Sequence, residues 1–131
     1  MLNGIISRLK SQSTVTDWVR DQVHEVAEAR QAHFPYIRVS MLSSIAHDDK
    51  DGPSDLDIYS IQVDAFSDKS ASEARKIAGV MRTALERYSG TEDGVVIQSI
   101  RYISETTFHN FDGSYPGEFA QSQDYSVRVT R

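Results

Sequence analysis

Four stretches of alternating apolar and polar residues restrict the fold of this chain more than any other feature of its sequence. They cover residues 35–42, 57–66, 94–104 and 124–130. A period of two places successive side chains on opposite faces of an extended strand, so each stretch is predicted to form a half-buried β-strand. In the second stretch, Ile61 and Val63 would face the core, while Gln62 and Asp64 would face away from it. The first two stretches are predicted to be antiparallel neighbours.

The clearest helix is predicted between the second and third strands. Ser70 and Glu73 have the spacing of a capping box at its start, and Gly90 is predicted to supply the left-handed residue that ends it. Its apolar stripe consists of Ala74, Ile77, Ala78, Met81, Ala84, Leu85 and Tyr88. We expect this stripe to pack on the apolar face of the sheet.

The amino-terminal part of the chain has a weaker pattern. A short amphipathic helix is predicted within residues 1–13, from apolar residues at helical spacing: Leu2, Ile5, Ile6 and Leu9. Residues 14–31 are compatible either with a helix or with a short helix that runs into a strand. The elements together predict an α+β fold in a single domain, residues 1–131, with helices packed on one face of an antiparallel sheet of four to five strands.

Composition excludes several classes of protein. The 131 residues suit one domain with its own core, and they contain no cysteine, which excludes disulfides, thiol catalysis and thiolate metal sites. No run of 18 apolar residues is present, so we expect no membrane span. The 14 Lys and Arg against 19 Asp and Glu give a net charge of -5, which argues against nucleic acid as a primary ligand.

The sequence also lacks the usual marks of catalysis. It holds no nucleophile elbow, no phosphate-binding glycine loop and no pair of histidines at metal-ligand spacing. We therefore predict no catalytic residues, no cofactor and no metal site.

An acidic segment, residues 46–57, lies between the first two predicted strands. Asp49, Asp51 and Gly52 match positions 3, 5 and 6 of a calcium-binding loop, but His47 and Ile58 occupy its first and last ligand positions, which excludes that site. We interpret the segment as a projecting loop that its aspartates hold in solvent: Asp48, Asp49, Asp51 and Asp55.

A second irregular segment, "TTFHNFDGSYPGEF", carries more aromatic residues than solubility requires. They are Phe108, Phe111, Tyr115 and Phe119. Two interpretations remain open, in which these side chains either fold back onto the core or contact a partner.

The order of the elements and four of its segments resemble the tail completion, or tail terminator, family of long-tailed bacteriophages and gene transfer agents. The resemblance covers the chain from about Val15 onward. The four segments are Val19 to Glu25, Pro35 to Val39, Ile61 to Phe66 with Glu73 to Ala78, and Gln123 to Val129. Arg20 departs from the family pattern, because the family favours glycine there.

The resemblance implies a fold and a function. It favours a short helix at about residues 14–19, followed by a strand near residues 22–26. Family members are non-enzymatic virion subunits that are assembled in the host cytoplasm. They form a six-membered ring on the last ring of the tail tube, end its growth and join the tail to the head.

The resemblance also implies partners. They would be further copies of the chain, the major tail tube protein and a head-tail connector or stopper protein, while DNA passes through the lumen without specific binding. Six copies at -5 would carry about -30, a charge that repels DNA. The acidic loop would then face the lumen or a partner. The alternatives are another neck protein, such as a head-completion or stopper subunit, and a small cytosolic enzyme or ligand-binding domain.

Overall fold

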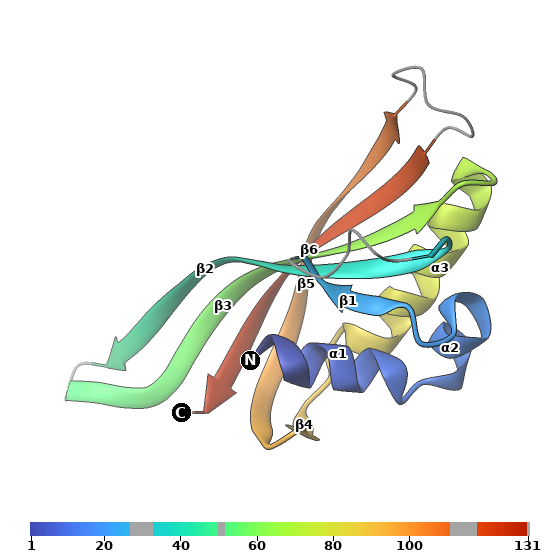
Figure 1. Cartoon of the computed structure of the whole chain (residues 1–131). Helices are drawn as coiled ribbons and strands as arrows, with labels where there is room; N and C mark the ends of the chain where they lie inside the picture. The colour runs from blue at the N-terminus through green and yellow to red at the C-terminus, as the bar shows by residue number, and fades with distance from the viewer. Residues whose placement is uncertain (27–32, 50–51, 111–117, 131) are drawn as a thin grey trace.

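The structure, a computed structural model, describes residues 1–26, 33–49, 52–110 and 118–130 (Figure 1). The helices are α1 (Leu2–Lys10), α2 (Ser13–Val19) and α3 (Ala71–Leu85). The strands are β1 (Val23–Glu25), β2 (Tyr36–Asp49), β3 (Gly52–Ser67), β4 (Gly90–Glu92), β5 (Val95–Asn110) and β6 (Glu118–Thr130). The strands form one curled sheet in the order β1-β2-β3-β6-β5-β4, and Figure 1 shows the helices gathered on one side of it.

The predicted α+β class and the placement of helices on one face are confirmed, but the predicted sheet is wrong in size and direction. Within the described residues it has six strands, and β1 pairs in parallel with β2, so that Val23 lies opposite Ile37. β1 is the strand that the family resemblance favours near residues 22–26, whereas β4 is not predicted, and each has three residues. Segments this short are hard to recognise from an alternating pattern, because a period of two needs four or more residues to show.

The core lies between the helices and the sheet. The alternation predicted for β3 is confirmed, because Ile61 and Val63 are fully buried towards the helices and Gln62 is only partly buried. Six of the seven residues of the predicted helical stripe are buried on α3: Ala74, Ile77, Ala78, Met81, Ala84 and Leu85. Burial of this stripe against β3 and β6 supplies much of the hydrophobic stabilisation.

The start of α3 agrees with the prediction and its end does not. The Ser70 hydroxyl accepts a hydrogen bond from the backbone N–H of Glu73 at 3.0 Å, whereas the Glu73 carboxylate accepts one from the Ser67 hydroxyl instead of returning to Ser70. The helix ends at Leu85, and the left-handed residue that follows is Arg87, with φ of 65°. The Arg87 N–H donates to the Ile100 carbonyl on β5, so the sheet ends the helix before Gly90 is reached.

One buried glutamine, Gln123, links α3 to the sheet. The Gln123 side chain on β6 is 1 % exposed, and its amide donates to the Ala78 carbonyl at 2.9 Å and to the Glu105 carboxylate at 2.7 Å. The Tyr125 hydroxyl donates to the Gln123 side-chain oxygen at 2.6 Å, and burial raises the pKa of Tyr125 above its ordinary value. The polar groups of Gln123 and Tyr125 are therefore paired, which the interior of a protein requires.

The first two central strands are longer than predicted. The segment predicted as a loop, residues 46–57, is mostly paired strand, with His47 opposite Leu56 and Asp48 opposite Pro53. The low strand propensity of Asp, Gly and Pro favours a loop here, but pairing with the neighbouring strand overrides that preference. In Figure 1 the paired ends of β2 and β3 extend beyond the helices. Over the described residues, no helix is long and apolar enough to cross a membrane.

The segment after α1 takes the second of the two predicted forms, a short helix followed by a strand. Arg20 joins α2 to β1 with φ of 58° and ψ of -123°, a conformation that favours glycine. This is the position at which the resembling family has glycine. Arg20 thus holds a strained backbone that glycine would relax.

We predict that Arg20→Gly stabilises the fold by about 1 kcal/mol, because glycine adopts this conformation without a steric penalty. The matched control is Arg75→Gly, which removes an exposed arginine from the middle of α3 and is expected to destabilise by about 1 kcal/mol. Thermal unfolding measures both changes, with an expected rise of about 4 °C for the first. Equal losses of stability in the two variants would contradict the strain at Arg20.

Candidate assembly interface

The second face of the sheet points away from the helices, and most of its residues are partly or fully exposed, although Tyr36, Asp64, Phe66, Ala120 and Ser122 are buried. Strand register sets the rows that cross this face from β2 through β3 and β6 to β5. The rows are Tyr36–Phe66–Ala120–Phe108, Arg38–Asp64–Ser122–Thr106, Ser40–Gln62–Asp124–Ser104, Ser43–Ser60–Ser126–Arg101 and Ile45–Ile58–Arg128–Ser99. The face is therefore aromatic at one end and rich in hydroxyl groups over its middle.

The middle rows balance their charges. Their two arginines, Arg38 and Arg101, stand among two aspartates, Asp64 and Asp124, and the other members are serine, threonine or glutamine. A surface without excess positive charge does not retain a polyanion such as DNA, because non-specific binding to phosphates depends on Lys and Arg.

One ion pair sits within this face. The Arg38 guanidinium donates to Asp64 Oδ2 from Nε at 3.1 Å and from Nη2 at 2.9 Å, and it lies over the Phe66 ring at 4.8 Å. Asp64 is 1 % exposed, and its Oδ1 has no hydrogen-bond partner among the described residues. Arg38 is thus the main compensation for a buried carboxylate.

The aromatic row holds one of the predicted contact residues. Tyr36 and Phe66 stack with ring centroids 4.7 Å apart, and Phe34 lies 5.3 Å from Tyr36. Phe108 stands on β5 at the other end of the row and is 49 % exposed. Phe119 lies in β6 opposite Ser67 and is partly buried. Two other predicted residues, Phe111 and Tyr115, lie outside the described residues, so a contact of these aromatics with a partner stays a prediction.

The acidic residues predicted to face a partner are only partly described. Asp48 and Asp49 form the end of β2, and Asp55 belongs to β3, but the structure describes the backbone alone at these positions. Asp51 lies outside the described residues. In the part of the chain that is described, no three His, Cys, Asp or Glu residues form a group that could hold a metal ion.

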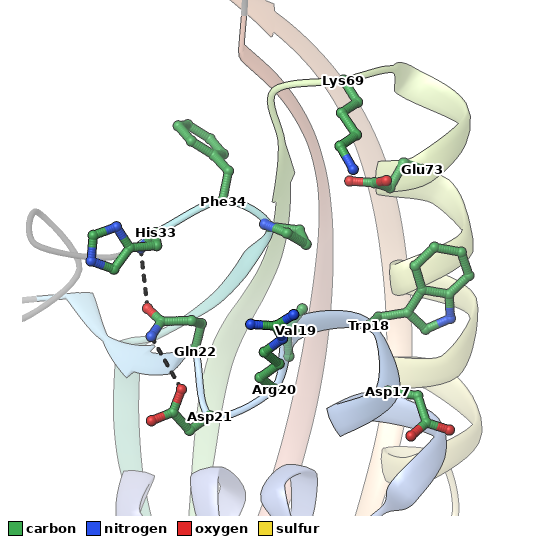
Figure 2. A pocket seen from close by; sticks show the side chains of 11 residues that line it. Asp17, Trp18, Val19, Arg20, Asp21, Gln22, His33, Phe34, Lys69 and Glu73 are labelled. Carbon is green, nitrogen blue, oxygen red and sulfur yellow. Dashed lines mark hydrogen bonds between the residues drawn. The ribbon is translucent and has the colours of Figure 1, made fainter.

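A pocket of about 590 Å³ opens beside α2 (Figure 2). Its lining comes from the end of α2, the turn into β1, the entry to β2 and the start of α3, and includes the exposed side chains of Trp18 and Phe34. In Figure 2 the ends of Lys69 and Glu73 point toward one another, but Asp17 and Asp21 point away from them, so the charged groups of the pocket do not all converge on one point. Small-molecule sites need such convergence, and an open pocket with an exposed tryptophan is more typical of a protein contact.

The sheet has two open edges that the sequence patterns do not reveal. β1 covers β2 only at residues 37–39, and β4 covers β5 only at residues 95–97. Beyond these short strands, no described strand pairs with the outer side of β2 from Ser40 or of β5 from Arg101. Large apolar side chains stand exposed on both edges: Met41, Leu42, Ile45, Ile103 and Phe108.

Comparisons with known proteins give a consistent result. A family model described as tail completion protein gp17 matches residues 3–125. A chain in the solved structure "Virion of native gene transfer agent (GTA) particle" is similar in fold, with a TM-score of 0.72 at 13% identity over 98% of this chain and 92% of that one. A second solved structure has a TM-score of 0.50 at 12% identity over 96% and 94% of the two chains. A search of curated protein sequences finds no match.

We predict that Arg38→Met destabilises the fold by about 2 kcal/mol, because it leaves the buried Asp64 carboxylate without its cation. The loss is below the roughly 3–5 kcal/mol typical of fully buried pairs because Arg38 reaches solvent. Adding Asp64→Asn to Arg38→Met removes the charge and should restore much of the lost stability. Denaturant unfolding of the two single variants and the double variant measures the coupling. Strictly additive losses would contradict the compensating role of Arg38.

Proposed function

This chain belongs to the tail completion protein gp17 family, and from that premise we propose that it closes the end of a tail tube as a ring and joins the tail to the head. Membership makes the protein a structural component of the virion tail and not an enzyme. The single observation that carries the proposal is the family match over residues 3–125, nearly the whole chain.

The shape of the subunit supports assembly into a ring. The sheet has helices on one face and two open edges. Exposed edge strands with apolar side chains tend to pair with other strands, so these edges are suited to contacts between copies. A ring is a head-to-tail assembly in which two different surfaces of each copy meet. A closed ring also ends growth, whereas a head-to-tail contact that does not close continues as a filament.

The open face supports passage of DNA through that ring. Its hydroxyl-rich rows carry balanced charge, and the chain as a whole has a net charge of -5. Six copies would carry about -30, which opposes binding of a polyanion in the lumen. We propose that this face, free of lysine over its middle rows, lines the channel.

The two ends of the ring would meet different partners, the tail tube protein on one side and a head connector or stopper protein on the other. The extended ends of β2 and β3, with Asp48 and Asp49, reach away from the helices and are suited to such a contact. The exposed Phe108, at the other end of the open face, is a second candidate.

The experiment that tests the function removes this protein from the particle and restores it from a second copy of its gene. Without it, we expect tails of abnormal length or tails that are not attached to filled heads, and the second copy should reverse the defect. Electron micrographs give tail length and attachment directly. Tails of normal length on heads that lose their DNA would assign the protein to a head-completion or stopper role, and normal attached tails would overturn the proposal.

A further inference from the structure

We infer that the open edge of β2 in one copy pairs with the open edge of β5 in the next copy, so that the sheet continues from subunit to subunit. The inference rests on the proposed ring for the number of copies, the direction of the pairing and the closure of the sheet. The choice of the two edges rests on the structure of a single chain.

Each edge contains one β-bulge, between Met41 and Ser43 on β2 and between Tyr102 and Ser104 on β5, but both edges lack the residue types that usually protect edge strands in monomeric proteins. Residues 40–45 of β2 carry no charge at all, and residues 102–108 of β5 carry one, that of Glu105. Neither segment contains lysine or proline, the residues that usually block edge pairing. The Glu105 carboxylate accepts hydrogen bonds from Gln121 and Gln123 of the same chain, so it is engaged within the subunit.

The two edges lie on opposite sides of the sheet and differ in sequence. In the strand order, β2 is second from one side and β5 is second from the other. The covered part of one edge lies in the same rows as the open part of the other. For example, β1 covers Val39 on β2, and the same row ends at Glu105, on the open part of β5. Two different surfaces at opposite ends of one body favour a head-to-tail joint over a symmetric one.

The direction of the strands fixes the type of pairing. β2, β3, β6 and β5 are successively antiparallel, so β5 runs opposite to β2. A ring rotates each copy about one axis and keeps the sense of β2, so β5 and the next β2 also meet antiparallel. The joint therefore extends the antiparallel pattern of the four central strands without interruption.

The offset of the two edges agrees with closure. The open apolar part of β2 is centred near Ser43 and that of β5 near Thr106, about four rows apart along the strands. At about 3.3 Å per residue the offset is roughly 13 Å, over four strand spacings of about 4.8 Å each. The resulting strand tilt of about 35° is within the range of roughly 35–45° at which sheets close into barrels.

The centred register also sets which side chains meet across the joint. With Ser43 opposite Thr106, Ile45 lies opposite Ser104 on the open face, whereas the bulge after Met41 leaves Met41 on the helix side and Phe108 on the open face. Ser43 and Thr106 both point to the open face of the sheet, as direct partners in an antiparallel pair must. The joint would remove part of the exposed apolar edge of each copy from solvent.

The chain contains no cysteine, so introduced thiols are its only thiols and report the joint directly. We expect a chain with Ser43→Cys, mixed with a chain with Thr106→Cys, to form a covalent dimer when a short bis-maleimide cross-linker is added. The length of the cross-linker tolerates a register shift of one or two residues. The chain carrying both substitutions should form a ladder that ends at six copies, in solution or in assembled particles. Both substitutions are small and lie at exposed positions.

Controls separate this joint from other contacts. Ser43→Cys alone and Thr106→Cys alone should stay uncross-linked, and so should Lys76→Cys on the exposed side of α3 mixed with Thr106→Cys. Leu42→Cys with Thr107→Cys is the second pair, used if either member of the first fails to fold. Cross-linking of Ser43→Cys with itself, or no cross-linking by either pair in assembled particles, would overturn the joint.

The outcomes also separate the joint from the proposed function. If cross-linking gives a ladder of six copies, but particles that lack the protein still have normal attached tails, the joint is supported and the proposed function is refuted. Defective tails in the absence of the protein, with no cross-link in assembled particles, would keep the function and remove the joint.

Discussion

The structure depends on the packing of α3 against β3 and β6, which buries one face of the curled sheet. Ile77 and Met81 on the helix meet Ile61 and Val63 on the sheet in one core, and the buried Gln123 holds the helix backbone to β6. Because the three helices of the described residues lie on that side, the exposed rows of the opposite face and the outer edges of β2 and β5 are left for contacts outside the subunit. The features that suit a tail protein follow from this one-sided packing.

The same packing explains how a subunit that is not an enzyme can have a definite function. The middle rows of the open face carry hydroxyl groups and balanced charge, and the buried Asp64 carboxylate is paired with Arg38. The open edges carry apolar residues and few charged ones. Such edges promote aggregation of a monomeric protein, but in an assembly they can pair with a neighbouring subunit. Function in this protein is therefore a matter of which surfaces remain after folding.

The sequence predicts the long elements well and the assembly surfaces poorly. Alternation identifies the four central strands, and the Ser70 cap with the apolar stripe identifies α3, because burial on one face leaves a periodic trace. β1 and β4 are too short for such a pattern, so β1 is expected only from the family resemblance and β4 is not predicted. Gly90 is a misleading stop signal because the Arg87 N–H donates to β5 first. The edges at Leu42 and Ile103 escape prediction for a different reason. Whether a strand has a neighbour is a property of the whole sheet and not of its own residues.

We propose that copies of this chain form a closed ring between tail tube and head. An electron-microscopy reconstruction of the neck of the intact particle measures this most directly. We expect one six-fold ring of this chain at the end of the tube, with β5 of each copy beside β2 of the next and the hydroxyl-rich face towards the channel. A different location for the chain, or a ring whose subunits meet through their helices, would contradict it.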